Sequence, residues 1–289
     1  MYTDLFGKTR LKINLHTHTT ASDGNFSPEA AAAHYKAAGY DCIAITDHWA
    51  WQKSGELSGL RILSGAEFNI GADCAAGVYH IVALGCEYAP FLTKDADAQE
   101  IIDEIRRCKG LPVLAHPHWS LNTVSQLSAL NGVEATEIWN SISAVGQSSR
   151  PCSDHFADSA ACAGFHLPLL AADDTHHYDG EDDLIGWIML EASENASDRE
   201  LLEAIRAKKF YATQGPEIHI FRDGDYAVVR CSPASRIAFL SNAAWAPGHG
   251  HSGEGLTEAV CRLQPYETFI RAEVTDASGK KAWSNFLTL

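Results

Sequence analysis

The sequence predicts an α/β protein, with a parallel or mostly parallel barrel followed by a small all-β domain. Short apolar strands alternate with helices over roughly the first two hundred residues, which is the pattern of repeated strand-helix-strand units. From about Glu217 the helical periodicity stops and only short alternating runs remain. We therefore expect a barrel domain over residues 1–216 and a β-sandwich-like domain over residues 217–289. In such barrels the chemistry collects at the carboxyl ends of the strands.

The expected barrel elements have start and stop signals. Ser27 and Pro28 cap and open a helix that ends before Gly39, and a capping box from Ser197 to Glu200 opens another. His80 lies at the beginning of its strand, so it reaches the same edge only if that strand runs against its neighbours. The expected strands are 12–15, 42–46, 61–66, 79–85, 112–115, 132–138, 167–172 and 186–190. The expected helices are 28–38, 96–108, 152–163 and 201–208.

The β-domain is predicted from alternating apolar runs separated by turns. Asp223-Gly224 and Ser278-Gly279 are typical turn residues. The stretch from Gly248 to Gly253 contains two histidines and could bind a metal, but its glycine content favours a flexible turn. The expected strands are 218–221, 226–231, 237–240, 259–263, 269–274 and 283–287.

The charge balance argues against some classes of partner. Lys and Arg total 22 against 37 Asp and Glu, and the resulting net charge of -15 repels polyanions. We therefore expect no binding to membranes and no non-specific binding to nucleic acid. The chain shows no leader-like start and no apolar run near the length of a membrane span, so we expect a cytoplasmic protein. The eight cysteines form no CxxC pair, which favours buried free thiols. The oligomeric state stays open.

Residues that commonly bind metals stand at the ends of the predicted strands. His16 and His18 are two residues apart, so their side chains share a face of the strand while Thr17 points away. A single pair of this kind is more often an ordinary polar segment than a site. Here the pattern recurs, and burying many imidazoles and carboxylates together is costly without a cation. The candidates for one metal centre are His16, His18, Asp23, His48, Glu67, His80, His116, Asp174 and His176.

Five motifs resemble, in order, those of the PHP (polymerase and histidinol phosphatase) family of metal-dependent phosphoesterases. They are His16-Thr17-His18-Thr19-Thr20-Ala21-Ser22-Asp23-Gly24, Ile45-Thr46-Asp47-His48, Gly65-Ala66-Glu67, Ala115-His116-Pro117 and Asp174-Thr175-His176. The resemblance covers about residues 11–190 and implies a distorted seven-stranded (β/α)7 barrel, in agreement with the strands above. The segments 205–216 and 276–289 resemble the CehA/McbA-type metallohydrolase branch of the family.

The resemblance also implies which residues share an ion. The first group is His16, His18 and Asp174, the second is His80 and His116, and Glu67 bridges the two. The third group is Asp23, His48 and His176. The cofactors would be two or three divalent ions, and imidazole ligands favour zinc, manganese or iron over calcium. Asp173 stands where family members usually carry a small residue, so it either binds metal directly or accepts a hydrogen bond beside the ligands.

The implied reaction is the hydrolysis of a small phosphorylated substrate by a metal-bound hydroxide that attacks phosphorus. Three divalent ions against three carboxylates would leave a charge of about +3, and two ions about +1, and either suits a phosphate. His118, Arg150 and His155 are candidates for phosphate contact or leaving-group protonation. Arg150 could instead be solvated surface, and His155 could cap its helix.

Other residues near the motifs are expected to support the site or to pack. Asp47 is expected to orient an imidazole. Packing is the expectation for His34 and His166. The indole rings of Trp49, Trp51 and Trp119 follow ligand segments and either wall a substrate pocket or pack.

Two other functions remain open on the sequence alone. The same centre could hydrolyse a carbamate, ester or amide at carbon, as the CehA/McbA-like tail suggests. A barrel that retains metal without turnover could instead be a binding protein whose β-domain recognises a partner. The sequence has no GxSxG elbow for Ser/His/Asp catalysis and no P-loop. The complete ligand spacing favours an enzyme over a binding protein. The family resemblance implies a phosphoric ester hydrolase in which Glu67 is both a catalytic residue and the shared metal ligand.

Overall fold

The strands of the first two hundred residues form two separately hydrogen-bonded sheets. The computed structural model describes residues 2–71, 77–145 and 149–289. A five-stranded sheet has the order β10-β9-β8-β7-β6, and a larger sheet contains the run β11-β2-β3-β5-β4. The strands of the first sheet are β6 (Gly65–Ile70), β7 (Tyr79–Leu84), β8 (Leu111–Leu114), β9 (Ala135–Asn140) and β10 (Leu169–Ala172). Those of the run in the second sheet are β2 (Thr9–Asn14), β3 (Cys42–Ala44), β4 (Gly55–Leu57), β5 (Leu60–Leu63) and β11 (Trp187–Glu191).

The two sheets meet where β5 passes into β6 at Gly65. The sequence predicts one strand over 61–66, but the chain leaves one sheet after Leu63 and joins the other. A Cβ on residue 65 would lie 2.5 Å from the carbonyl oxygen of Ile45 and 2.8 Å from Cγ2 of Thr46. Only glycine allows the chain to pass this close to the end of β3. The close passage places Glu67 next to His48, and these two residues form a parallel β-bridge.

The strand that carries His80 runs in the expected direction. The remaining strands only partly follow the expected parallel barrel. β2, β3 and β5 are parallel, as are β8, β9 and β10. β7 is antiparallel to both β6 and β8, which confirms the prediction from the position of His80. β11 runs antiparallel to β2, and although β10 and β11 lie side by side, no ladder joins them in the described residues. The α/β class is confirmed, and the closed seven-stranded (β/α)7 barrel is not.

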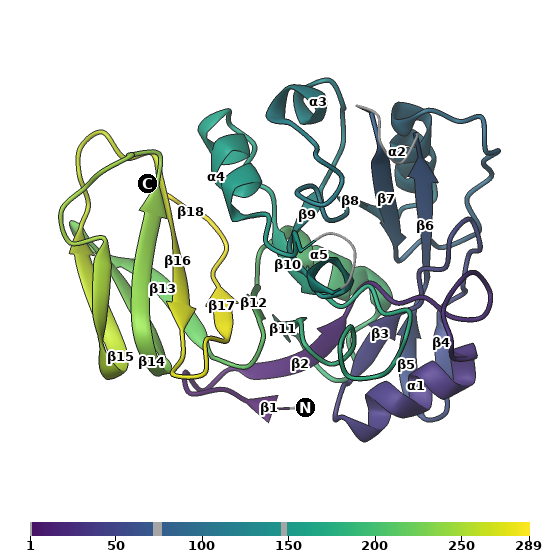
Figure 1. The fold of residues 1–289 in the computed structure, drawn as a ribbon, viewed down its shortest axis with the longest axis horizontal. Coiled ribbons are helices and arrows are strands. Elements are labelled where there is room, and N and C mark those ends of the chain that lie inside the picture. The colour runs from purple at the N-terminus through teal and green to yellow at the C-terminus, as the bar shows by residue number, and fades with distance from the viewer. Residues whose placement is uncertain (1, 72–76, 146–148) are drawn as a thin grey trace.

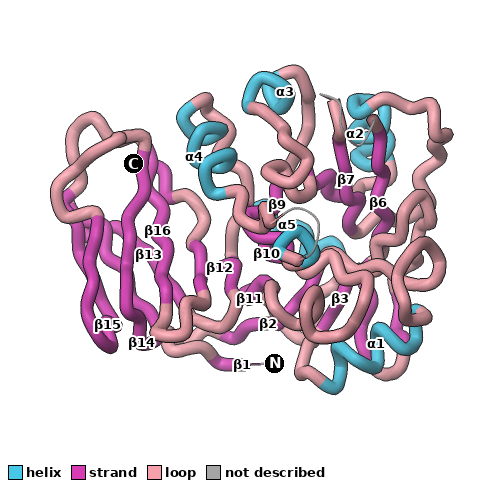
Figure 2. The backbone as a smooth tube through the Cα atoms, in the orientation of Figure 1, coloured by secondary structure: helices cyan, strands magenta, loops and turns pink. Residues whose placement is uncertain are grey.

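Figures 1 and 2 show α1 at the lower edge of the view and α2, α3 and α4 at the upper edge, with α5 near the centre. The predicted caps are present: Ser27 accepts a hydrogen bond from Ala30 N, and Ser197 forms a capping box with Glu200. The chain between β3 and β5 contains the short strand β4 in place of a helix, and this departs from strict strand-helix alternation. The helices are α1 (Pro28–Ala37), α2 (Ala98–Arg107), α3 (Val124–Ser128), α4 (Asp154–Cys162) and α5 (Asp198–Arg206), with a 3-10 turn η1 (Ile142–Ala144).

The C-terminal strands continue the larger sheet and stand at one end of the molecule (Figure 1). The two predicted runs 226–231 and 237–240 belong to one bent strand, β14, whose register shifts around Ala234. The predicted Gly-rich turn is partly strand, because β15 begins at Gly250. These strands are β13 (Ile218–Asp223), β14 (Tyr226–Ser241), β15 (Gly250–Arg262), β16 (Phe269–Thr275), β17 (Lys281–Trp283) and β18 (Leu287–Thr288); two shorter pieces are β1 (Tyr2–Thr3) and β12 (Phe210–Thr213).

The β-strands of the tail pack tightly against the N-terminal region. β17 pairs with β12, the Trp283 ring stacks on Trp139 with centroids 5.9 Å apart, and the buried Arg271 binds Asp158 of α4. The larger sheet therefore contains strands from both sides of the predicted domain boundary at 216/217. The division into two domains stays a prediction. The seven described cysteines are free, and five of them are buried as expected, whereas Cys152 is partly buried and Cys162 is exposed. Cys74 lies outside the described residues. No helix in the described ranges is long and apolar enough to cross a membrane.

Candidate metal centre

All nine predicted ligands lie together at one edge of the two sheets. His16 and His18 follow β2, His48 follows β3, and His116 follows β8. The strand ends are tied to one another by backbone bonds, since Asp174 N donates to His16 O at 2.9 Å and His18 N donates to Thr175 O at 2.9 Å. Two of the nine have positive φ, 27° at His116 and 55° at Asp174. Such backbone strain in non-glycine residues is concentrated at functional sites.

The first group gathers around the carboxylates of Glu67 and Asp174. Oε2 of Glu67 lies 3.3 Å from His16 Nε2 and 3.2 Å from His18 Nε2. Oδ1 of Asp174 lies 3.2 Å and 2.9 Å from the same two nitrogens. All four side chains are buried, with donor atoms within 4.8 Å of one another. This is the predicted first group, with Glu67 included.

Glu67 connects this group to the second one. Its Oε1 lies 2.8 Å from His80 Nδ1 and 3.4 Å from His116 Nε2. Its Oε2 also lies 3.1 Å from His48 Nδ1. Because its two oxygens face different imidazoles, one carboxylate can serve neighbouring cations. That is the bridging position expected for this residue.

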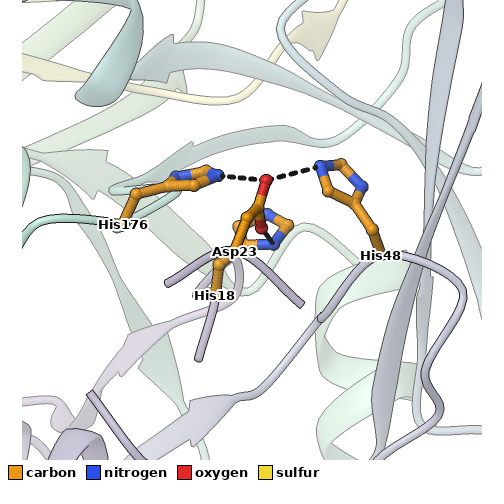
Figure 3. A group of neighbouring side chains, drawn as sticks. All are labelled: His18, Asp23, His48 and His176. Atoms are coloured by element: carbon orange, nitrogen blue, oxygen red, sulfur yellow. Dashed lines mark ion pairs between the residues drawn. The ribbon is translucent and has the colours of Figure 1, made fainter. Parts of the chain in front are cut away.

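The third group surrounds the half-exposed carboxylate of Asp23. In Figure 3 the imidazoles of His48 and His176 approach this carboxylate from opposite sides, and His18 lies beneath it. Oδ2 of Asp23 is 3.5 Å from His176 Nε2 and 3.7 Å from His48 Nε2, while Oδ1 is 3.4 Å from His18 Nδ1. The structure therefore adds His18 to the expected third group. Its Nδ1 faces Asp23, while its Nε2 faces the first group.

The donor atoms have the character of a cation site rather than of a hydrogen-bonded network. In the described part of the chain, Oδ1 of Asp174 and Nδ1 of His48 are buried, and the atoms that lie 2.9–3.2 Å from them are not in hydrogen-bonding geometry. Orphaned buried atoms of this kind are costly unless a ligand satisfies them. Imidazole and carboxylate donors in these numbers suit a divalent transition-metal ion. The residues present thus fit the ions that the motifs imply.

The electrostatics of the cluster also favour a cation. Burial opposes protonation of His16, but Asp174 and Glu67 outweigh it and raise the pKa of this imidazole well above its ordinary value. Burial likewise opposes ionisation of Glu67, but His16 and His80 hold the pKa of its carboxyl well below the usual range. Burial lowers the pKa of His48, which keeps that ring neutral. Carboxylates that attract protons to the imidazoles will equally attract a metal ion, which displaces those protons.

Glu137 supports the centre and was missed in the sequence. Its Oε1 is 2.8 Å from His16 Nδ1, and its Oε2 accepts hydrogen bonds from His116 N at 2.9 Å and Asn140 Nδ2 at 2.8 Å. By accepting a hydrogen bond from Nδ1–H of His16, the carboxylate orients the ring so that Nε2 faces Glu67 and Asp174. A charged residue inside the apolar strand β9 was the signal that could have identified it.

We expect Glu137→Gln to weaken metal binding by about 10- to 100-fold, the usual cost of losing a carboxylate behind a ligating histidine. The amide can donate to Nδ1 and so favours the wrong tautomer of His16. Competition with a chromogenic chelator measures the affinity, and excess metal should restore much of the activity. Unchanged affinity would contradict the positioning role. Glu87, an exposed glutamate that pairs with Lys109, is replaced in the same way as the matched control.

Two further aspartates hold the loops that carry the ligands. Asp47 was expected to orient an imidazole, but this is wrong: its carboxylate accepts hydrogen bonds from Thr19 N, Thr19 Oγ1 and Ser22 Oγ at 2.6–2.7 Å. It therefore fixes the loop that presents Asp23. Asp173 faces away from the ligand groups and accepts hydrogen bonds from Tyr35 Oη and from the backbone that follows the site.

Of the two alternatives for Asp173, the structure favours the hydrogen-bond acceptor over the metal ligand. Its carboxylate binds Ser141 Oγ and the backbone N–H groups of Leu184, Ile185 and Gly186 at 2.7–3.0 Å. Burial raises the pKa of this carboxyl to about 6, although these hydrogen bonds act in the opposite direction. The residue anchors the segment that returns from the site to β11.

Gly24 allows the first ligand loop to close. A Cβ at this position would collide with the backbone of His18, at 2.5 Å from its carbonyl carbon, and lie 2.6 Å from Thr19 N. Because backbone atoms cannot move aside cheaply, we expect Gly24→Ala to cost about 1–3 kcal/mol of stability and to weaken metal binding. Thermal unfolding with and without added Mn²⁺ measures both effects. Gly39→Ala, whose Cβ would meet nothing within 4 Å but whose φ is +78°, separates a packing clash from backbone strain. Equal metal affinity in wild type and Gly24→Ala would contradict this account.

A cavity of about 620 Å³ opens directly above the three groups. Trp119 forms part of its wall, whereas Trp49 and Trp51 pack beside α2. His177 and Glu181 also line it and were not among the predicted site residues. The ligand-group residues that line it are Asp23, His48, Glu67, His80, His116, Asp174 and His176, and the others are Trp119, Ile142, Ser143, Val145, His177 and Glu181.

The three candidates for phosphate contact do not line this cavity. His118 is exposed, and its Nδ1 is 2.7 Å from the carbonyl oxygen of Cys152. Arg150 and His155 are exposed as well, the latter in the first turn of α4. Their catalytic roles therefore stay predictions without support from the geometry.

The remaining histidines behave largely as expected. His34 Nε2 lies 2.5 Å from Asp183 Oδ2, and His166 packs on Phe269 and Phe286. His249 is far from the centre in the β-domain, 3.0 Å from Glu267.

Comparison with known proteins identifies the fold. No protein-family model and no curated protein matches the chain. The structure is similar to a two-domain protein from Bacteroides vulgatus ATCC 8482 that contains a predicted PHP-like metal-dependent phosphoesterase, with a TM-score of 0.53 and 15% identity, over 100% of this chain and 97% of the other. The match thus includes the β-domain.

Two further solved structures show weaker similarity. An amidohydrolase from Chromobacterium violaceum has a TM-score of 0.42 and 17% identity, over 59% of this chain and 89% of that one. Endonuclease Q bound to a duplex with an abasic lesion has a TM-score of 0.47 and 13% identity, over 69% and 57%. Scores this low add nothing to the assignment. The full-length match confirms the PHP resemblance at the level of the fold: this chain folds as the two-domain PHP-like protein does.

Proposed function

We propose that the protein is a metal-dependent phosphoesterase that hydrolyses a small phosphorylated metabolite. The observation that carries the proposal is the clustering of three donor groups, two of which share Glu67, beside a cavity of about 620 Å³. The PHP-like phosphoesterase in the two-domain structural relative supports the same class of reaction. A cavity of this size suits a small ligand.

The residues of the chain have separable tasks in this reaction. The first and second groups, joined by Glu67, would hold two divalent ions, and the group around Asp23 would hold a third. When bound, such ions activate water at neutral pH and neutralise phosphate charge. Glu137 and Asp47 keep the ligands in place, and the remaining lining residues are left to contact the substrate.

The deciding experiment measures metal content and turnover on the same sample. The purified protein, loaded with Zn²⁺, Mn²⁺ or Fe²⁺, is assayed on phosphate monoesters and diesters beside aryl esters and carbamates. We expect phosphate release from a phosphate ester and loss of that activity after chelation. Turnover of carbon esters or carbamates alone would contradict the proposal and favour the CehA/McbA-type reaction. A fully loaded but inert protein would favour the binding role.

A further inference from the structure

The part of the cavity that is not built from metal ligands is lined by apolar and by polar residues. We call the three apolar residues Trp119, Ile142 and Val145 the apolar wall. Each of these side chains is partly exposed, so each has surface free to contact a ligand. The polar lining residues outside the ligand groups are the exposed His177 and Glu181 and the buried Ser143, which stands between Ile142 and Val145 in the chain.

The apolar wall stands directly beside the second metal group. The ring of Trp119 is 4.9 Å from that of His116 at 81°, and 5.4 Å from that of His80 at 64°, measured between centroids. A group attached to a phosphate held beside His80 and His116 therefore has the indole within reach. An indole stabilises a second aromatic ring beyond the effect of the area that the two rings bury.

The rest of the wall is held in shape without a ligand. Ile142 begins the turn η1, where its backbone N–H donates to Asp173 O at 3.0 Å. Val145 N closes the turn by donating to Ile142 O at 3.1 Å. A preformed wall loses little conformational entropy when it binds an apolar group.

The polar side disfavours additional negative charge on the substrate. Glu181 is a lining carboxylate that belongs to none of the three ligand groups. Its loop is fixed, because the buried Asp182 accepts hydrogen bonds from the backbone of His176 and His177 at 2.8 Å. A second anionic group on the substrate would meet this carboxylate, and the protein as a whole carries a net charge of -15.

We propose that the substrate is the phosphate monoester of an arylalkyl alcohol, with the phosphate as its only anionic group. This deepens the proposed function and rests on it. Water adds to phosphorus, the bond from phosphorus to the alcohol oxygen breaks, and the alcohol leaves with a proton. Trp119, Ile142 and Val145 hold the aromatic part, and Glu181 excludes carboxylated or doubly phosphorylated relatives.

Binding of non-hydrolysable phosphonates tests the proposal without turnover. Calorimetry on the Mn²⁺-loaded protein compares benzylphosphonate, ethylphosphonate and 4-carboxybenzylphosphonate. We expect the benzyl compound to bind about tenfold more tightly than the ethyl compound, and the added carboxylate to weaken binding by about tenfold. Equal binding of benzyl and ethyl compounds, or tighter binding of the carboxylated one, would overturn the proposal.

Variants assign the effects to residues. Trp119→Leu should remove most of the preference for benzyl over ethyl, Trp119→Phe should retain it, and Trp245→Leu, on an exposed loop of the β-domain, should not alter it. Glu181→Gln should reduce the penalty on the carboxylated compound, and Glu181→Lys should reverse it. If Trp119→Leu loses metal, the relative affinities of the wild-type protein for the three phosphonates and the results with the Glu181 variants still test the proposal. An unchanged penalty in Glu181→Lys would contradict the role of Glu181.

Turnover of the matching phosphates separates this inference from the function on which it rests. Benzyl phosphate and ethyl phosphate are both esters of primary alcohols, so the comparison depends mainly on binding. Hydrolysis of both with equal kcat/KM would overturn the inference and leave the phosphoesterase intact. Selective binding of benzylphosphonate, with no hydrolysis of any phosphate, would overturn the proposed function and leave the shape of the pocket as described.

Discussion

Replacing Glu67 by Gln is expected to reduce phosphate-ester kcat/KM by about a thousandfold or more and to lower the metal content per chain. The carboxylate lies 2.8–3.4 Å from imidazole nitrogens of the first and second groups and also faces His48. The amide keeps the shape but removes the charge that two neighbouring cations would share. Loss of several kcal/mol of transition-state stabilisation corresponds to a factor of this size.

The measurement pairs steady-state kinetics with elemental analysis of the dialysed protein. Glu87→Gln is the matched control, because Glu87 is exposed and pairs with Lys109 far from the cavity. We expect it to leave both quantities unchanged. A Glu67→Gln protein that kept its metal and its activity would remove the bridging role from this account.

Replacing Asp158 by Asn is expected to lower the free energy of unfolding by about 3–5 kcal/mol. The fully buried Arg271 of β16 is held by this carboxylate of α4, with Nε to Oδ1 at 2.6 Å and Nη2 to Oδ2 at 2.8 Å. Without the carboxylate, the guanidinium is left buried between β16 and α4 with its main ion-pair partner removed. Denaturant unfolding followed by circular dichroism gives the free energy.

Two further variants test the physical reason. Asp158→Asn combined with Arg271→Met removes both charges and should recover much of the loss. The exposed pair Arg230 and Glu258 gives the contrast, and Glu258→Gln should change stability by no more than about 0.5–1 kcal/mol. A small effect of Asp158→Asn, equal to that of Glu258→Gln, would contradict the assignment of this contact as a major link.

Most candidate ligands could be predicted because they stand at or just beyond strand ends, where local sequence fixes their position. Glu67, which lies inside β6, and Asp23, which lies in the loop after β2, depart from this pattern. His16 and His18 share a face by strand periodicity alone, and the position of His80 required an antiparallel strand, which β7 is. The three groups came from the family resemblance, and the structure brings the same residues together. Metal binding itself stays a prediction.

What could not be predicted depends on contacts between distant segments. In the sequence, Glu137 is one residue of a predicted strand. Its contact with His16, 121 positions away in the chain, becomes visible only in the folded structure. Asp47 contacts the loop of Thr19 instead of its neighbour His48, because the backbone turns after β3. The division into two sheets follows from a close passage at Gly65 that no local pattern reveals. The walls of the cavity likewise come from loops whose shape the sequence does not state.

Anomalous-scattering crystallography of the Mn²⁺- or Zn²⁺-loaded protein tests the central claim most directly. We expect peaks on both sides of Glu67, one among His16, His18 and Asp174 and one beside His80 and His116. A third peak would lie beside Asp23. The absence of any peak within the cavity of a catalytically active crystal, or peaks confined to the separate aspartate cluster at 179–183, would contradict the account.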